Sequence, residues 1–196
     1  MHPEAVLLAL RRAWLAIEPL RLPVAVMGGL ALAVWQHVRA TRDVDLAISL
    51  EQHELERLLD RLREAGIRRK PGSSLVHLGG QDVVPLLYEP PDTFMDVQVD
   101  LMLANGPYQR QALDRRVEAN LPALDIAIDV LSCEDLILHK LLAGRLIDRY
   151  DAAALVRINR QTLDVSYLRQ WSGELGLDAE LSSVWLEACP GETPPR

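Results

Sequence analysis

Two aspartates separated by one residue, Asp43 and Asp45, are the strongest candidates for chemistry in this sequence. The residues from 43 to 48 alternate between polar and apolar, as in a β-strand. Side chains two positions apart on a strand point to the same side, so both carboxylates can share divalent cations. Without a cation, two unpaired carboxylates in an apolar strand would be costly, although a solvated edge strand is the alternative. Ligands made only of oxygen favour Mg²⁺, which takes its other ligands from water and substrate phosphates.

A Gly28-Gly29 turn lies before the aspartates and is suited to a phosphate. It follows a short apolar strand, Val24–Met27, and we expect a helix over Leu30–Val38 after it. Glycines at the start of a helix let backbone amides approach a phosphate, whose negative charge the amino end of the helix favours. An ordinary structural turn is the alternative. Together with the aspartates, the turn predicts a site for a nucleoside triphosphate with magnesium.

The elements that must position these residues form a mixed α/β half up to residue 131. We expect helices over Ala5–Ile17 and Glu51–Glu64 because their apolar residues follow helical spacing. Further along, the pattern predicts strands over Ser74–Leu78, Val83–Tyr88, Phe94–Leu103 and Leu124–Val130, and a short helix over Tyr108–Arg116. After residue 131 it predicts helices over Cys133–Ala143, Asp148–Ile158, Val165–Gly173 and Ala179–Ala188. We therefore divide the chain into an α/β core, residues 1–131, and a helical subdomain, residues 132–196, packed on it.

Two stretches resemble the signature of the polymerase-β-like nucleotidyltransferase superfamily, in particular its small bacterial AbiEii-toxin-like members. The first is Met27-Gly28-Gly29-Leu30-Ala31 followed by His37-x-Arg39-x-Thr41-x-Asp43-Val44-Asp45. The second is Ser132-Cys133-Glu134-Asp135 followed by Lys140, Arg145 and Asp148-x-x-Asp151. The resemblance implies a minimal nucleotidyltransferase fold, an α/β (α+β) mixed sheet with helices and a C-terminal helical part. It also implies transfer of a nucleoside monophosphate from a nucleoside triphosphate to an acceptor hydroxyl, with two Mg²⁺ ions and release of pyrophosphate.

A pair of metal ions of this kind usually needs a third carboxylate from a neighbouring strand. Asp100 fits best because Val99 and Leu101 beside it are apolar and because its place in the strand resembles that of the family's third acid. Asp100 could also take the proton of the attacking hydroxyl. Asp96, four residues earlier on the same face, is the alternative third carboxylate. The predicted metal ligands are Asp43, Asp45 and Asp100.

The resemblance also gives Lys140 a place at the nucleotide. Only Lys70 and Lys140 are lysines among the 21 basic residues, and Lys140 falls within the motif. We therefore expect Lys140 to contact triphosphate oxygens as a point charge. A lysine on the helix surface, paired with Glu134 or Asp135, is the alternative.

Asp148 and Asp151 are two further acids of the second stretch. If Gly144 ends the preceding helix, the turn that follows can bring both acids toward the nucleotide. The alternative is an acid pair at the start of a helix, with Arg145 as its ion-pair partner.

The residues just before the aspartates match the first stretch. Arg39 and Thr41 are expected to orient the glycine turn or the γ-phosphate, whereas Arg42 has no match and His37 is expected to be packed. The arginines and lysine at 68–70, with Arg110, Arg115 and Arg116, offer a basic rim for RNA, with ordinary solvated charges as the alternative.

Composition limits the class of protein. The 196 residues are 49% hydrophobic with a net charge of −7, which fits a soluble globular protein and excludes disordered and collagen-like chains. No uncharged stretch is long enough to span a membrane, and neither Cys133 nor Cys189 has metal-type spacing. We expect reduced thiols, a cytoplasmic location and no membrane partner.

The resemblance implies a toxin-like enzyme with tRNA or a protein as acceptor and a cognate antitoxin as partner. A nucleotidyltransferase acting on a small antibiotic-type molecule is the alternative enzyme. A non-catalytic relative that only binds a nucleotide or a partner is the alternative from another class.

Overall fold

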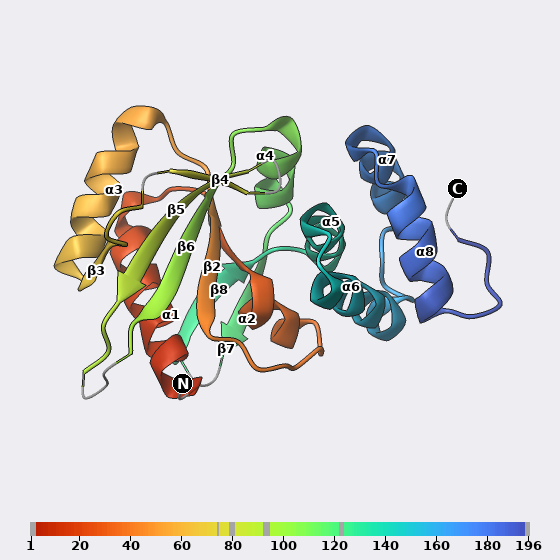
Figure 1. Ribbon diagram of the computed structural model, residues 1–196, viewed down its shortest axis with the longest axis horizontal. Helices are drawn as coiled ribbons and strands as arrows, with labels where there is room; N and C mark the ends of the chain where they lie inside the picture. Colours follow the sequence, from red (N-terminus) through yellow and green to blue (C-terminus); the bar gives the residue numbers. More distant parts are fainter. Residues whose placement is uncertain (1–2, 74, 79–80, 92–94, 122–123, 195–196) are drawn as a thin grey trace.

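The computed structural model describes residues 3–73, 75–78, 81–91, 95–121 and 124–194 (Figure 1). Its helices are α1 (Pro3–Ile17), the 3₁₀ helix η1 (Glu18–Leu20), α2 (Gly28–Val34), α3 (Gln52–Glu64), α4 (Pro107–Asp114), α5 (Cys133–Ala143), α6 (Leu146–Asn159), α7 (Val165–Leu175) and α8 (Asp178–Ala188). Its strands are β1 (Val24–Met27), β2 (Asp43–Ile48), β3 (Ile67–Arg69), β4 (Val76–Leu78), β5 (Gln81–Tyr88), β6 (Val97–Leu103), β7 (Val117–Leu121) and β8 (Ile126–Val130).

One mixed sheet holds all the described strands, in the order β3-β5-β6-β2-β1-β8-β7, with β4 paired to β5. At its centre β2 runs antiparallel to β1 and parallel to β6, so β2 is hydrogen-bonded on both sides. The predicted central position of the Asp43–Ile48 strand is therefore confirmed, and the edge-strand alternative is wrong. The two aspartates of β2 therefore lie in the middle of the sheet, between β1 and β6.

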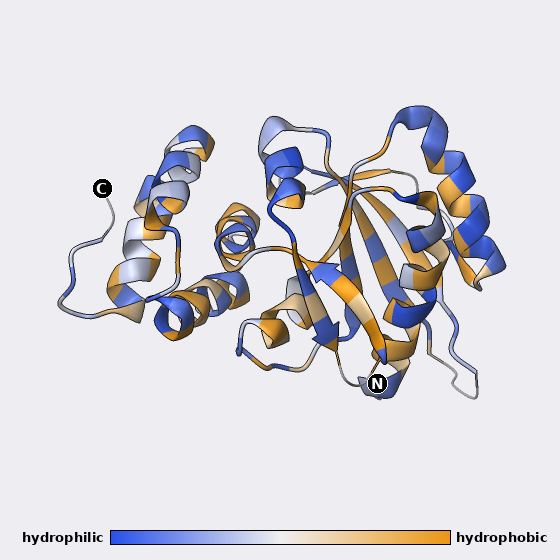
Figure 2. Ribbon diagram, turned by 180° about the vertical axis from the view of Figure 1, so that it is seen from behind, coloured by the Kyte–Doolittle hydropathy of each residue, from blue (hydrophilic) through white to orange (hydrophobic). Residues whose placement is uncertain are grey.

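Helices α1 and α3 pack together beside the sheet, and α5 to α8 gather beyond its β8 side (Figure 1). In Figure 2 the central strands alternate between hydrophobic and hydrophilic residues, whereas most of α3 is hydrophilic. This alternation places one set of strand side chains in the core and leaves the other set for the site. Among the described residues no helix is long and apolar enough to cross a membrane.

Several hydrogen bonds join the α/β half to the helices that follow it. Asn159 Nδ2 of α6 donates to the carbonyl of Trp35 at 3.1 Å, and the hydroxyl of Tyr108 in α4 donates to the carbonyl of Asp135 in α5 at 3.3 Å. Gln81 Nε2 of β5 lies 3.0 Å from the buried His139 Nδ1 of α5. The helical part is thus packed against the core rather than carried on a separate linker.

The structure corrects several predicted elements. Helix α2 is shorter than expected because it begins at the glycines and ends at Val34, and β3 and β7 were not predicted at all. Both missed strands are short and carry polar residues, so no apolar run marked them. The first residues of two expected strands, 74 and 94, lie outside the described residues.

Candidate active site

The strand register brings together the predicted carboxylates. In the parallel pairing of β2 and β6, Asp45 lies opposite Asp100, and Asp43 lies opposite Gln98. Residues opposite each other in a sheet share a face, so Asp43, Asp45 and Asp100 all point to the same side. Asp96 lies before the strand begins, and its carboxylate is paired with Arg68 at 3.0 Å. The geometry therefore favours Asp100 over Asp96 as the third acid.

The electrostatics of this triad are those of carboxylates that lack a counter-charge. Burial, followed by the charges of Asp43 and Asp100, raises the pKa of Asp45 to about 7. Burial also raises the pKa of Asp100, against the opposing effect of a 2.8 Å hydrogen bond donated by Gln98 to Oδ2. The other carboxylate oxygen, Oδ1, is buried and has no hydrogen-bond partner. An oxygen in that state is costly unless a cation meets it.

Magnesium fits the donor set of the triad, which consists of oxygen atoms only. Within the described part of the chain no three acidic, histidine or cysteine side chains are already arranged to hold a metal ion. The raised pKa values and the partnerless Oδ1 of Asp100 are the features that a divalent cation would reverse.

The glycine turn lies directly against the aspartates. Gly28 has a φ of +62°, and a Cβ atom added to it would lie 1.8 Å from Asp45 Oδ2. A Cβ atom on Gly29 would lie 2.6 Å from Thr41 Oγ1. Thr41 Oγ1 in turn donates a 2.6 Å hydrogen bond to Asp43 Oδ1. Glycine is therefore favoured at both positions, and Thr41 orients the carboxylate of Asp43, while its expected role at the turn or the γ-phosphate stays a prediction.

Lys140 lies buried between two aspartates of α6. Its Nζ atom is 2.9 Å from Asp148 Oδ1 and 2.9 Å from Asp151 Oδ2, and the residue is 6% exposed. The alternative of a surface lysine paired with Glu134 or Asp135 is therefore wrong. The predicted contact with triphosphate oxygens stays a prediction, but Lys140 lies near enough to lower the pKa of Asp45.

Asp151 connects α6 to the loop before β2. Its carboxylate accepts a 2.9 Å hydrogen bond from His37 Nε2 and 3.1 Å hydrogen bonds from Arg39 Nε. Burial would raise the pKa of Asp151, but the hydrogen bonds from Lys140 and His37 outweigh it and hold the pKa below its usual value. Arg39 thus contacts Asp151 rather than the glycine turn, and His37 is packed as expected.

Arg145 is a residue of the site that the sequence analysis treated only as an ion-pair partner. Gly144, with a φ of +67°, ends α5 as predicted, and the chain turns at once so that Arg145 pairs with Asp148 at 2.5 Å. The hydrogen bond to Asp148 and the charges of Asp45 and Asp43 raise the pKa of Arg145. Its side chain is 71% exposed, so this cation can still reach a ligand above the triad.

The match of this chain to known proteins decides its family. A model of the nucleotidyl transferase AbiEii toxin family, type IV toxin–antitoxin system, matches residues 9–189. The chain belongs to the AbiEii nucleotidyltransferase toxin family. No curated protein matches it.

Solved structures confirm the predicted fold of this family member. An antigenic nucleotidyltransferase-like protein from Paracoccidioides brasiliensis has a TM-score of 0.52 at 19% identity over 91% of both chains. JHP933 from Helicobacter pylori has a TM-score of 0.51 at 15% identity over 92% of this chain and 77% of that chain. ANT(2")-Ia in complex with adenylyl-2"-tobramycin has a TM-score of 0.56 at 14% identity over 85% of this chain and 96% of that chain. At these identities the likeness shows the nucleotidyltransferase fold alone.

Two of the basic residues assigned to an RNA rim have other partners in this family member. Arg115 pairs with Glu134 and Asp135, and its guanidinium lies 3.8 Å from the centre of the Tyr167 ring. Arg116 pairs with Asp129 at 2.8 Å. These arginines therefore stabilise the fold through ion pairs, and the RNA rim stays a prediction.

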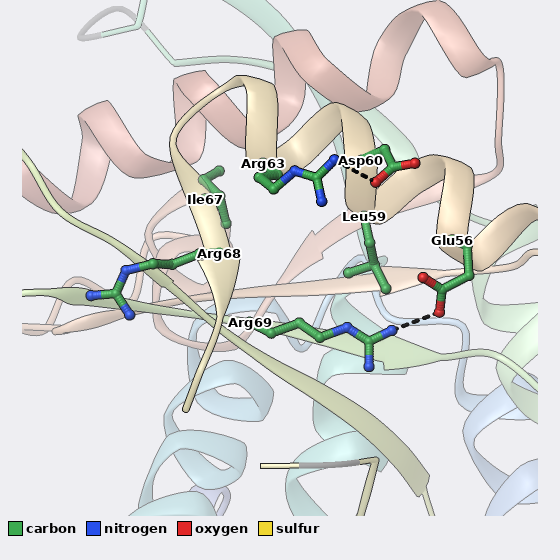
Figure 3. A pocket seen from close by; sticks show the side chains of 7 residues that line it. All are labelled: Glu56, Leu59, Asp60, Arg63, Ile67, Arg68 and Arg69. Atoms are coloured by element: carbon green, nitrogen blue, oxygen red, sulfur yellow. Dashed lines mark hydrogen bonds and ion pairs between the residues drawn. The ribbon is translucent and has the colours of Figure 1, made fainter. Parts of the chain in front are cut away.

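A surface pocket of about 230 Å³ lies away from the triad, between α3 and β3 (Figure 3). Two ion pairs cross it, Arg63 with Asp60 and Arg69 with Glu56, and Arg68 points out of it. The pairs neutralise its charges, so nothing in it selects a charged ligand. The carboxylate triad, and not this pocket, is the candidate active site.

Proposed function

We propose that this AbiEii-family nucleotidyltransferase transfers a nucleoside monophosphate from a nucleoside triphosphate to an acceptor hydroxyl in a magnesium-dependent reaction. The observation that carries the proposal is the pairing of Asp45 with Asp100, beside Asp43, directly under the Gly28 turn. Magnesium ions held by these carboxylates would stabilise the charge on the attacking and leaving oxygens. The toxin role, a cognate antitoxin, and tRNA or a protein as acceptor remain part of this proposal on the basis of the family.

Each residue near the triad has a definable task in such a reaction. Gly28 leaves room for the Asp45 carboxylate directly beside the turn, because a Cβ atom at this position would lie 1.8 Å from Asp45 Oδ2. Thr41 fixes the orientation of Asp43 through its hydrogen bond. Arg145 is the exposed cation whose charge acts on Asp43 and Asp45, which suits it to the triphosphate. Asp100 lies on the opposite flank of Asp45 from the turn, where the acceptor hydroxyl would lose its proton.

The test is binding and turnover in matched variants. We expect magnesium-dependent binding of nucleoside triphosphate, and incorporation of labelled nucleotide from it in a cell extract, to be lost in D45N and in D100N. D82N is the control. Asp82 lies on β5 three residues before Pro85, which is opposite Asp100, so its side chain is on the other face of the sheet, where it pairs with His77 and Asn105. Magnesium-independent binding with no pyrophosphate release would instead identify a non-catalytic relative.

The labelled product also separates the candidate acceptors. Each radiolabelled nucleoside triphosphate is incubated with the protein, Mg²⁺ and a cell extract, and the products are separated into RNA, protein and small molecules. Label in RNA or protein supports the macromolecular acceptor, and label only in a small molecule supports the antibiotic-type alternative.

A further inference from the structure

Three consecutive basic residues at the edge of the sheet, 68–70, alternate between its two faces. Arg68 lies opposite Leu87 on β5, and Leu87 lies opposite Gln98 on β6, so Arg68 is on the face of the triad. Lys70 is two residues further along, and its backbone amide donates to the carbonyl of Pro85, the residue opposite Asp100. Lys70 therefore shares the triad face, in the same row as Asp100.

Arg69, between them, points to the other face. It pairs with Glu56 of α3 at 2.8 Å and lines the pocket on the helical side (Figure 3). Residues 69 and 70 thus offer two exposed positive charges that are neighbours in sequence but lie on opposite sides of the sheet.

Lys70 reaches toward Asp100 without forming an ion pair. Its Nζ atom lies 3.4 Å from Gln98 Oε1, and Gln98 Nε2 donates at 2.8 Å to Asp100 Oδ2. Arg68 is neutralised by Asp96, whereas no carboxylate among the described residues pairs with Lys70. Lys70 is exposed, so its flexible side chain can leave the weak contact to Gln98 and meet a ligand.

The position of Lys70 on the sheet indicates a role in binding the acceptor substrate, and this role rests on the proposed function. The glycine turn lies at the end of β1, on one flank of Asp45, and β6, β5 and β3 extend from the other flank. In an in-line displacement the attacking and leaving groups lie on opposite sides of the phosphorus. With the triphosphate on the β1 flank, the acceptor lies over β6 and β5, within reach of Lys70.

We propose that Lys70 determines acceptor specificity by binding an anionic group, a backbone phosphate next to the terminal hydroxyl of an RNA strand. An unpaired lysine attracts a phosphate and repels a polycationic small molecule. The contacts through Gln98 show that Lys70 and Asp100 are close on one face of the sheet, so a phosphate bound at Lys70 brings the neighbouring hydroxyl toward Asp100.

The experiment compares K70E with R69E, which change the net charge equally on opposite faces. The probe is a short fluorescein-labelled single-stranded RNA with a free 3′-hydroxyl. Its binding is followed by fluorescence anisotropy with Mg²⁺ and the α,β-methylene analogues of the four nucleoside triphosphates. A second probe has neutral methylphosphonate linkages at its 3′ end. Far-UV circular dichroism confirms folding, and K70Q replaces K70E if the latter does not fold.

We expect K70E to weaken binding about tenfold, because an attraction is replaced by a repulsion of similar size, and R69E to bind like the wild type. K70Q lowers the slope of log affinity against log salt by about 0.7, the value for one phosphate contact to a single strand. The difference between K70E and R69E disappears with the methylphosphonate probe.

Equal losses in K70E and R69E would overturn the proposal, since they would show only an effect of net charge. It is also overturned if the wild type does not bind the RNA probe but transfers labelled nucleotide to a protein or a small molecule in the extract. In that second case magnesium-dependent transfer remains, so the failure of this inference is distinct from a failure of the proposed function.

Discussion

Replacement of Lys140 by methionine tests the central ion-pair cluster. Methionine keeps the length of the side chain but removes the charge, which leaves Asp148 and Asp151 buried with fewer partners. Removal of one partner from a buried ion pair costs about 3–5 kcal/mol of unfolding free energy. Asp148 keeps Arg145, and Asp151 keeps His37 and Arg39, so we expect the low end of that range, about 3 kcal/mol.

The assay is urea unfolding followed by tryptophan fluorescence at pH 7, with R149M as control. Arg149 pairs with Glu187 on the surface, where an ion pair contributes at most about 1 kcal/mol.

For Asp148, burial would raise the pKa, but hydrogen bonds from Arg145 and Lys140 outweigh it and lower the pKa below 3.8. A lowered folded-state pKa stabilises the fold above the unfolded value, and this stabilisation is lost as the pH falls. The loss of unfolding free energy in K140M is therefore complete at pH 7 and becomes smaller below about pH 4. If K140M costs no more than R149M, Lys140 does not hold the two acids and the interpretation of the cluster is wrong.

The remaining predictions concern the glycine turn and a buried histidine. G28A should abolish magnesium-dependent binding of nucleoside triphosphate in a titration, since its Cβ would meet Asp45, whereas G72A, at a φ of +73° with nothing within 4 Å, should lose only about 1 kcal/mol of stability and keep binding. Equal binding by the two variants would contradict the assigned contact. Burial lowers the pKa of His139 to about 4 from 6.5, so the unfolded state binds the additional proton and stability falls as the pH drops below 6.5. The raised pKa of Asp45 acts in the opposite sense over this range, so the prediction concerns the difference between variants. Between pH 7 and 5 the unfolding free energy of the wild type, measured by urea unfolding, should fall by about 2 kcal/mol relative to that of H139Q, and H77Q should follow the wild type because His77 is exposed.

The sequence was sufficient for the elements that have a strong local pattern. The helix Cys133–Ala143 was predicted with its observed ends, because Ser132 caps its first turn and Gly144 adopts the left-handed conformation after its last. In contrast, β3 has no apolar alternation and β7 alternates over only five residues, VEANL, so each was missed and is completed by its pairing with β5 or β8. Such strands are stabilised by their neighbours, which no local pattern reveals.

The candidate site likewise has features that the sequence predicted and features that only the structure revealed. The residue types of Asp43 and Asp45, their spacing on one strand and the glycines before them were visible in the sequence, because a period of two fixes their common face. The choice of Asp100 over Asp96 required the register of β6 against β2. Residues that act together across the sheet have no fixed separation in the chain.

The sequence by itself determined which groups are available: a pair of carboxylates, a glycine turn and two lysines in a chain rich in arginine. Only the tertiary structure decided what each charge faces. Lys140 is buried among aspartates, whereas Lys70, exposed and without an ion pair among the described residues, lies on the triad face. The physical reason is that the energy of a charge depends on its burial and on partners within a few ångströms, and folding brings those partners from distant parts of the chain.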